Sequence, residues 1–124
     1  MSTPAGNDRV QQFVSFRQRM NERILAEDNK LVQRFFALDK NCYADGALDG
    51  RTKELLGLVA SLVLRCDDCV SYHIAQSRKV GWTPEQIFDA MGVGLLVGGS
   101  IVIPHLRRAV DFLDQVEAQD APVV

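Results

Sequence analysis

Hydrophobic positions recur at helical spacing, three and four residues apart, along almost the whole chain. No segment alternates between apolar and polar residues as a half-buried strand does. Between residues 10 and 38, the apolar positions predict either one bent helix or two. Residues 41–50 contain two glycines and several polar residues typical of turns, so they predict a loop that ends this unit. The pattern is that of an all-α protein.

The most apolar segments follow this loop. A helix is predicted over residues 50–64, with Asp49 as its N-cap, and it is apolar around most of its circumference. Such a helix belongs in a core or in a subunit interface. Residues 66–80 predict a second helix, which Gly81 ends. We expect the chain to fold back near Arg65, so that the two helices form a central antiparallel pair.

Two further helices are predicted downstream. The first begins at residues 83–86, Thr-Pro-Glu-Gln, which combine a capping box with a proline in the first turn. The uncharged stretch over residues 90–106 is interrupted by Gly98, Gly99 and Pro104. It therefore predicts a buried helix, a break and a new helix, since a membrane span needs roughly 20 mostly apolar residues. The last helix has one apolar face, formed by Leu106, Val110, Leu113 and Val116.

These elements predict one compact domain of five or six helices over residues 9–118, with flexible ends at residues 1–8 and 119–124. The composition, 47% hydrophobic and 24% charged, is ordinary for a folded protein and excludes a wholly disordered chain. A net charge of -2 argues against nucleic-acid binding. The first residues lack the basic-then-apolar order of a secretory signal. We therefore expect a cytoplasmic protein that does not insert into a membrane.

Three cysteines add candidate chemistry, because Cys66 and Cys69 are only three residues apart. A close pair in a reducing compartment is more often catalytic or metal-binding than structural. A thiol at the start of a helix lies near N–H groups whose partial positive charge stabilises a thiolate. His73 follows Cys69 by four residues, one turn along the same face. An imidazole at that position can take the thiol proton directly or through a water molecule.

Glu54 is a further candidate for this site. It lies 11 residues before the expected turn at Arg65, and His73 lies 8 residues after it. Their depths along an antiparallel pair therefore differ by only about 4–5 Å. At that depth Glu54 can orient His73 and raise its basicity. Asp67 and Asp68 oppose thiolate formation beside the cysteines, whereas the helix N-terminus favours it, and the sequence leaves this balance open.

Two other interpretations of the cysteine pair are open. The first is a pair of small buried hydrophobic residues, which the spacing to Glu and His disfavours. The second is a zinc site with Cys66, Cys69 and His73 as ligands. Its fourth ligand would come from Cys42, His105 or a carboxylate. Ligands within two turns of one helix suit a tetrahedral site poorly, so we expect no metal and no cofactor. Cys42 is then a free thiol, and His105 a structural or interfacial residue.

The spacing of Glu54, Cys66-x-x-Cys69 and His73 resembles the motif of the alkylhydroperoxidase D-like branch of the carboxymuconolactone decarboxylase family. The resemblance covers residues 49–112 and implies a helical domain that assembles into trimers or hexamers. It also implies peroxide reduction with electrons from a thiol partner, such as a lipoyl-type dithiol. By position, Cys69 is the peroxidatic thiol, Cys66 closes the disulfide, and His73 with Glu54 forms the proton relay. The sequence departs from the family at Asp68, where a histidine is usual.

We therefore expect a thiol-dependent peroxidase. Its partners would be a hydroperoxide, a dithiol electron donor and further copies of the chain, because the apolar segments exceed what one chain of this size hides. One alternative is decarboxylation of a small lactone acid by His73 and Glu54. The family members that decarboxylate generally lack the cysteine pair, so both cysteines favour the redox branch. Another alternative is a non-catalytic oligomer that uses the pair as a redox sensor.

Overall fold

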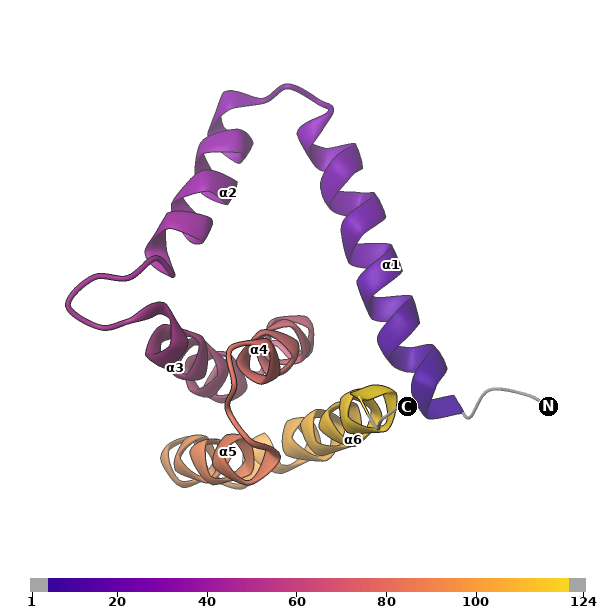
Figure 1. Cartoon of the computed structure of the whole chain (residues 1–124), viewed down its shortest axis with the longest axis vertical. Coiled ribbons are helices and arrows are strands. Elements are labelled where there is room, and N and C mark those ends of the chain that lie inside the picture. The colour runs from indigo at the N-terminus through magenta and orange to yellow at the C-terminus, as the bar shows by residue number, and fades with distance from the viewer. Residues whose placement is uncertain (1–4, 121–124) are drawn as a thin grey trace.

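The computed structural model describes residues 5–120, and in this part of the chain every regular element is a helix (Figure 1). The all-α prediction of five or six helices is confirmed. The elements, in chain order, are α1 (Ala5–Leu25), α2 (Lys30–Cys42), α3 (Gly50–Val63), α4 (Asp67–Lys79), α5 (Pro84–Gly98), the short 3₁₀ helix η1 (Ser100–Val102) and α6 (Ile103–Asp120).

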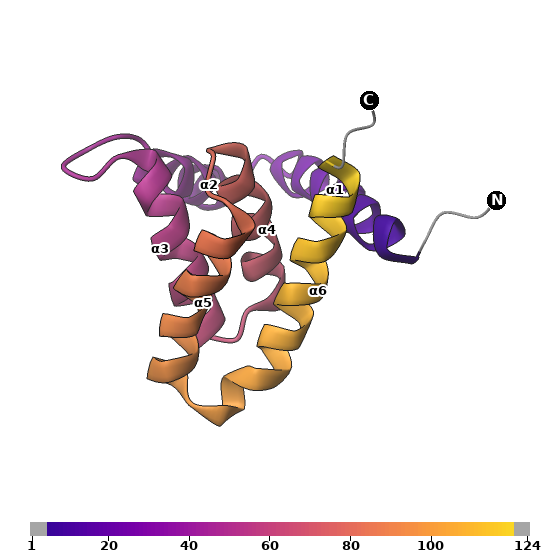
Figure 2. The ribbon, with the colours of Figure 1, turned by 60° about the horizontal axis from the view of Figure 1, so that its bottom comes forward.

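Helices α3 and α4 form the predicted antiparallel pair (Figure 2). Asp49 caps α3, and its side chain accepts a hydrogen bond from the Thr52 N–H at 2.7 Å. The chain turns between the helices at Arg65, which adopts a left-handed backbone conformation with φ 61°. Cys66 is the N-cap of α4. Local capping at both starts therefore places the reversal where the hydrophobic pattern predicted it.

Helices α5 and α6 pack against this pair and close a bundle of four helices (Figure 2). The capping box at the start of α5 is present, with Thr83 and Gln86 bonded reciprocally. Trp82, just before it, donates its indole N–H to the Arg51 carbonyl at 2.7 Å and so ties this corner to α3. The core is apolar and draws on every helix of the bundle and on α1: Val10, Leu58, Leu62, Val70, Ile74, Ile87, Met91, Val102, Ala109, Phe112, Leu113 and Val116.

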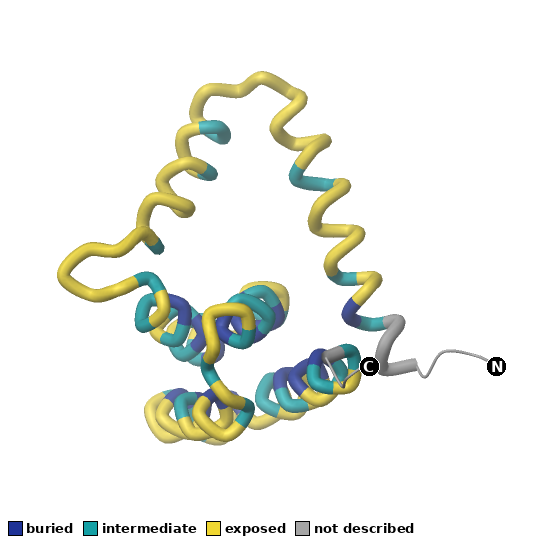
Figure 3. Tube along the Cα trace, in the orientation of Figure 1, coloured by how far each residue is buried: buried dark blue, intermediate teal, exposed yellow. Residues whose placement is uncertain are grey.

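Residues 10–38 form two helices rather than one, with a left-handed turn at Asp28 and Asn29 as the cap of α2. Helix α1 is anchored by its first half, where Phe13 meets Phe112 edge to face with ring centroids 5.6 Å apart. Its second half and all of α2 extend away from the bundle (Figure 3). Helix α2 buries none of its residues, and Phe35 on its apolar stripe is 64% exposed. Among residues 5–120, nothing therefore covers these apolar positions.

The interrupted apolar stretch is a helix, a break and a new helix, as predicted. Gly99, with φ 81°, ends α5, and η1 leads into α6. Within the described residues, no helix is long and apolar enough to cross a membrane. The flexible ends expected at residues 1–8 and 119–124 stay a prediction. Residues 1–4 and 121–124 lie outside the described part, while residues 5–8 belong to α1 and residues 119–120 to α6.

Candidate functional site

Cys66 and Cys69 lie at the N-terminus of α4, where they are joined in a disulfide with their Cα atoms 5.3 Å apart. Cys66 has the extended backbone of an N-cap residue, and its Sγ accepts a hydrogen bond from the Cys69 N–H at 3.3 Å. The free N–H groups of a helix start carry partial positive charge. When the disulfide is reduced, this end of α4 therefore stabilises a thiolate.

Asp67 and Asp68, in the same first turn, face different surroundings. Asp67 lies 2.7 Å from His105 Nδ1 and 3.5 Å from an Arg108 guanidinium nitrogen, both on α6. Its negative charge is therefore directed at two groups of α6. Asp68 instead lines a pocket beside Cys69. His105, for which the sequence predicted a structural or interfacial role, makes a contact that joins α6 to the start of α4.

Glu54 and His73 lie together behind the disulfide, as the fold-back at Arg65 allowed. His73 Nδ1 is 2.9 Å from Glu54 Oε1, and each residue is only 8% exposed. A carboxylate only accepts hydrogen bonds, so Nδ1–H is the donor, and in the neutral form of the ring the lone pair lies on Nε2. In a buried site this pairing holds the ring in one orientation. The contact is made by residues 19 apart in the chain, through the packing of α3 on α4.

Tyr43 belongs to the same group, although the sequence analysis did not identify it. It caps the C-terminus of α2, and its hydroxyl oxygen lies 3.2 Å from His73 Nε2. Gly57 on α3 makes this approach possible. A Cβ at that position would lie 2.5 Å from the Tyr43 oxygen and 2.8 Å from His73 Cε1. The available signal was a glycine inside an otherwise apolar helix, together with one aromatic residue in a segment of turn formers.

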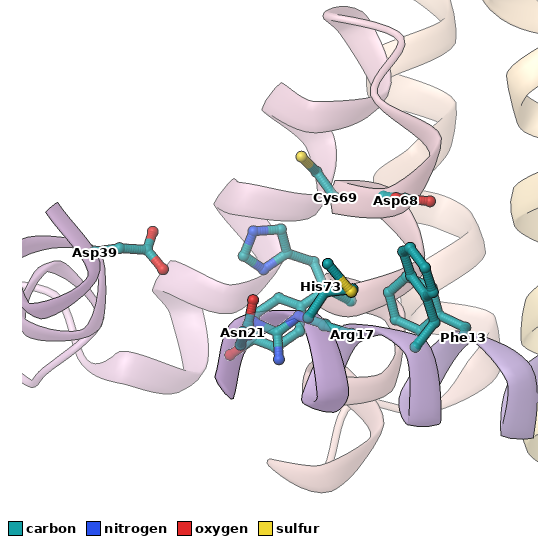
Figure 4. A pocket seen from close by; sticks show the side chains of 10 residues that line it. Phe13, Arg17, Asn21, Asp39, Asp68, Cys69 and His73 are labelled. Atoms are coloured by element: carbon teal, nitrogen blue, oxygen red, sulfur yellow. The ribbon is translucent and has the colours of Figure 1, made fainter. Parts of the chain in front are cut away.

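A pocket of about 310 Å³ opens beside Cys69 and His73 (Figure 4). Figure 4 shows that Phe13, Arg17 and Asn21 reach it from α1 and that Asp39 reaches it from α2. Cys69 and His73 line it from α4, whereas Cys66 does not. The other lining side chains are Phe16, Met20, Asp68 and Tyr72. The pocket thus combines one thiol and one imidazole with a largely apolar wall.

The two tyrosines near His73 keep their protons at neutral pH. Burial raises the pKa of Tyr43, and the charge of Glu54 raises it further. Burial likewise raises the pKa of Tyr72, against the opposing effect of Arg17. The Arg17 guanidinium lies 4.0 Å from the centre of the Tyr72 ring, in a cation–π arrangement. Both phenols are therefore neutral hydrogen-bond donors at the edge of the site.

The described residues contain no group of three or more His, Cys, Asp or Glu side chains arranged to hold a metal ion. Cys42, considered as a fourth zinc ligand, is a free and exposed thiol, and His105 is bonded to Asp67. What the site offers chemically is a cysteine pair joined in a disulfide, an imidazole held by a carboxylate, and a pocket with a largely apolar wall.

A six-helix fold with a Cys-x-x-Cys pair capping one helix, and a buried Glu–His pair behind it, defines a class of all-helical dithiol proteins. The model of the carboxymuconolactone decarboxylase family matches residues 29–112, more than half of the chain. The protein therefore belongs to the carboxymuconolactone decarboxylase family, as its motif indicated.

The protein is also similar to several known proteins. It is 36% identical, over 83 residues, to uncharacterised protein 4 in the cox locus of Paracoccus denitrificans. The matched segment covers 67% of this chain and 75% of that relative. The crystal structure of TM1620 from Thermotoga maritima is 50% identical, with a TM-score of 0.86 over 90% of this chain and 97% of that one. An involvement in the antioxidative response has been suggested for TM1620. The family protein lpg0406 from Legionella pneumophila shares the fold. It is 22% identical, with a TM-score of 0.79, and the match covers 88% of this chain and 97% of that one.

Proposed function

We propose that this protein is a thiol-dependent peroxidase that reduces hydroperoxides through Cys66 and Cys69. The observation that carries the proposal is the position of the pair at the start of α4, with His73 one turn further along and held by buried Glu54. A helix start favours the thiolate, and the imidazole of His73, one turn further along α4, serves as the base. Family membership and the antioxidative response suggested for TM1620 support the same chemistry.

Cys69 is the attacking thiol in this proposal, because it lines the pocket together with His73 and Cys66 does not. His73 takes the Cys69 proton, and the thiolate attacks the terminal oxygen of the hydroperoxide. An S–O bond forms, the O–O bond breaks, and an alcohol leaves with the proton from His73. The product is a sulfenic acid at Cys69, oxidised by two electrons.

Cys66 then resolves the sulfenic acid. Its thiolate attacks Cys69 Sγ, the S–S bond forms, and the sulfenic oxygen leaves as water once it is protonated. A lipoyl-type or other dithiol donates two electrons and two protons to the pair and is itself oxidised to a disulfide. The Cα separation of 5.3 Å lies within the range of ordinary disulfides, which supports the resolving role of Cys66.

We also propose that the working form is a homo-oligomer, a trimer or a hexamer by resemblance to the family. Large apolar residues lie exposed on α2 and along α5, where Leu96 is 83% exposed and Val97 is 70% exposed. A soluble monomer rarely leaves such contiguous apolar faces uncovered. Further copies of the chain are the natural cover, since most soluble oligomers are symmetric assemblies of identical chains.

The testing experiment is hydroperoxide consumption by the purified protein supplied with dihydrolipoamide. Cys69→Ser should abolish turnover, whereas the matched control Cys42→Ser should leave it unchanged, because Cys42 is exposed and outside the site. No turnover by the wild-type protein, with both thiols titratable, would sink the proposal. Disulfide formation that is reversible without turnover would then indicate a redox sensor. Lactone decarboxylation that survives Cys66→Ser/Cys69→Ser would indicate the lyase.

A further inference from the structure

Both ring nitrogens of His73 are occupied in the disulfide form. Glu54 lies at Nδ1, 2.9 Å away, and the Tyr43 hydroxyl lies at Nε2, 3.2 Å away. The positions of the protons on the His73 ring follow from its two hydrogen-bond partners, Glu54 and Tyr43. The Glu54 carboxylate requires a hydrogen on Nδ1, so the neutral ring has its lone pair on Nε2, and the Tyr43 O–H donates to that lone pair.

The contact between Tyr43 and His73 is built from α3. Gly57 leaves the space that the phenol oxygen and the imidazole occupy together. Lys53, one turn before Gly57, donates to the carbonyls of Cys42 at 3.0 Å and Ala44 at 2.8 Å, the residues on either side of Tyr43. The backbone that carries the phenol is therefore held to the same helix that carries Glu54, so α3 positions both partners of the His73 ring.

We propose that Tyr43 is a positioning residue for His73: its hydroxyl holds the imidazole as the Nδ1–H tautomer with Nε2 as the base. The inference rests on the proposed peroxidase function and deepens it. A phenol both donates and accepts, so the same group serves both protonation states of the ring. It donates to Nε2 of the neutral ring. When the Cys69 thiol delivers its proton, the phenol first turns away from the Nε2 lone pair. Nε2 takes the proton, the phenol oxygen accepts from the new N–H, and this proton then leaves with the alcohol.

His73 faces titratable groups from several elements besides Glu54 and Tyr43. The Tyr72 ring meets the His73 ring edge to face, with centroids 5.2 Å apart. The remaining charged or ionisable groups line the pocket that His73 shares: Arg17 from α1, Asp39 from α2, and Asp68 and Cys69 from α4. Tyr72 is the matched control for Tyr43, since it also touches the His73 ring but carries its hydroxyl towards Arg17.

The test observes the tautomer of His73 directly. Protein labelled with ¹⁵N-histidine, in the disulfide form and without peroxide, is followed by long-range ¹H–¹⁵N NMR across a pH titration. The wild-type protein should show the Nδ1–H tautomer. Tyr43→Phe should show a mixture of tautomers and a displaced His73 titration, and Tyr72→Phe should match the wild type. His105 provides an internal reference in the same spectra.

The wild-type protein and Tyr43→Phe are then assayed for peroxide reduction. Tyr43→Phe should lower kcat/KM about five-fold, the size expected for one lost hydrogen bond, and should displace the pH profile. Unchanged His73 spectra in Tyr43→Phe, or an unchanged pH profile in an active enzyme, would overturn the positioning role. Shifted spectra with an inactive wild-type protein would instead overturn the peroxidase proposal alone. If Tyr43→Phe does not fold, Lys53→Met, which releases the backbone around Tyr43, should give the same shift to a smaller extent.

Discussion

The bundle of α3–α6 and the arm formed by α1 and α2 share one kind of hydrophobic pattern, but they use it differently. In the bundle, Leu58 and Leu62 on α3 are fully buried against neighbouring helices. In the arm, α2 buries none of its residues, and Leu31 is 76% exposed. Helical periodicity therefore predicts that a segment forms a helix, but it does not predict the surface against which the apolar face of that helix packs. A bare apolar stripe on a well-formed helix supports the proposal that further copies of the chain cover α2.

The candidate site lies at the boundary between these two regions. The bundle contributes the disulfide and the Glu54–His73 pair, whose geometry is held by close packing. The arm contributes the pocket wall through Phe13, Arg17 and Asp39, and the segment after α2 contributes Tyr43. In the proposed mechanism the reacting groups therefore belong to the tightly packed bundle, and much of the wall that a substrate would meet belongs to the arm.

The largest expected effect compares a buried leucine of the bundle with an exposed leucine of the arm. Leu62→Ala should lower the free energy of unfolding by about 3 kcal/mol, since it leaves a cavity among fully buried side chains. Leu38→Ala, on the exposed stripe of α2, should change it by less than about 0.5 kcal/mol in the monomer. Urea denaturation of both variants measures the difference. Equal losses for the two would mean that the arm is as well buried as the bundle.

The next prediction concerns what covers the arm. Phe35→Asp should weaken self-association by about 2 kcal/mol for each copy of the side chain in the interface, the value of burying one large apolar group. Sedimentation equilibrium of wild type and variant measures this effect. Ala37→Asp, at an exposed position on the same helix, adds the same single negative charge and is the matched control. If Phe35→Asp forms an assembly of the same mass and with the same association constant as the wild type, other copies of the chain do not cover α2.

A smaller effect is expected at the buried pair. Glu54→Gln keeps the shape of the side chain but replaces the acceptor of the His73 Nδ1–H by a neutral amide. We expect kcat/KM for peroxide reduction to fall about ten-fold, because a hydrogen bond to a charged group is lost. Steady-state kinetics with hydroperoxide and dithiol measure this fall. The exposed Glu85→Gln should leave the rate unchanged, and an equal rate in Glu54→Gln would remove Glu54 from the mechanism.

The smallest effect is expected where α6 meets the start of α4. His105→Gln removes a partly exposed contact to Asp67 and should lower the free energy of unfolding by about 0.5 kcal/mol, since solvent screens such pairs. Loss of this partner leaves the Asp67 charge, beside the cysteines, with the more distant Arg108 guanidinium at 3.5 Å. The disulfide should therefore be reduced at a measurably different potential in a dithiol redox titration. If the free energy of unfolding and the reduction potential of the disulfide are both unchanged in the variant, the contact between His105 and Asp67 does not influence the cysteine pair.

Much of the fold follows from local sequence. The helix starts at Asp49 and Thr83 are capped as predicted, because a cap depends on residues within one turn. The Cys66-x-x-Cys69 spacing likewise determines that both thiols meet at one helix end. The motif as a whole predicted the family that the comparison shows.

Only the tertiary structure decided the contacts between distant segments. It brought Tyr43 to His73 across 30 residues and His105 to Asp67 across 38, and neither pairing leaves a periodic signal in the sequence. Periodicity specifies the face that a helix buries, whereas the partner of that face depends on how the helices dock. The sequence by itself therefore determined the helices, the cysteine pair and the candidate base. The packing of α3, α4 and α6 decided which side chains surround them.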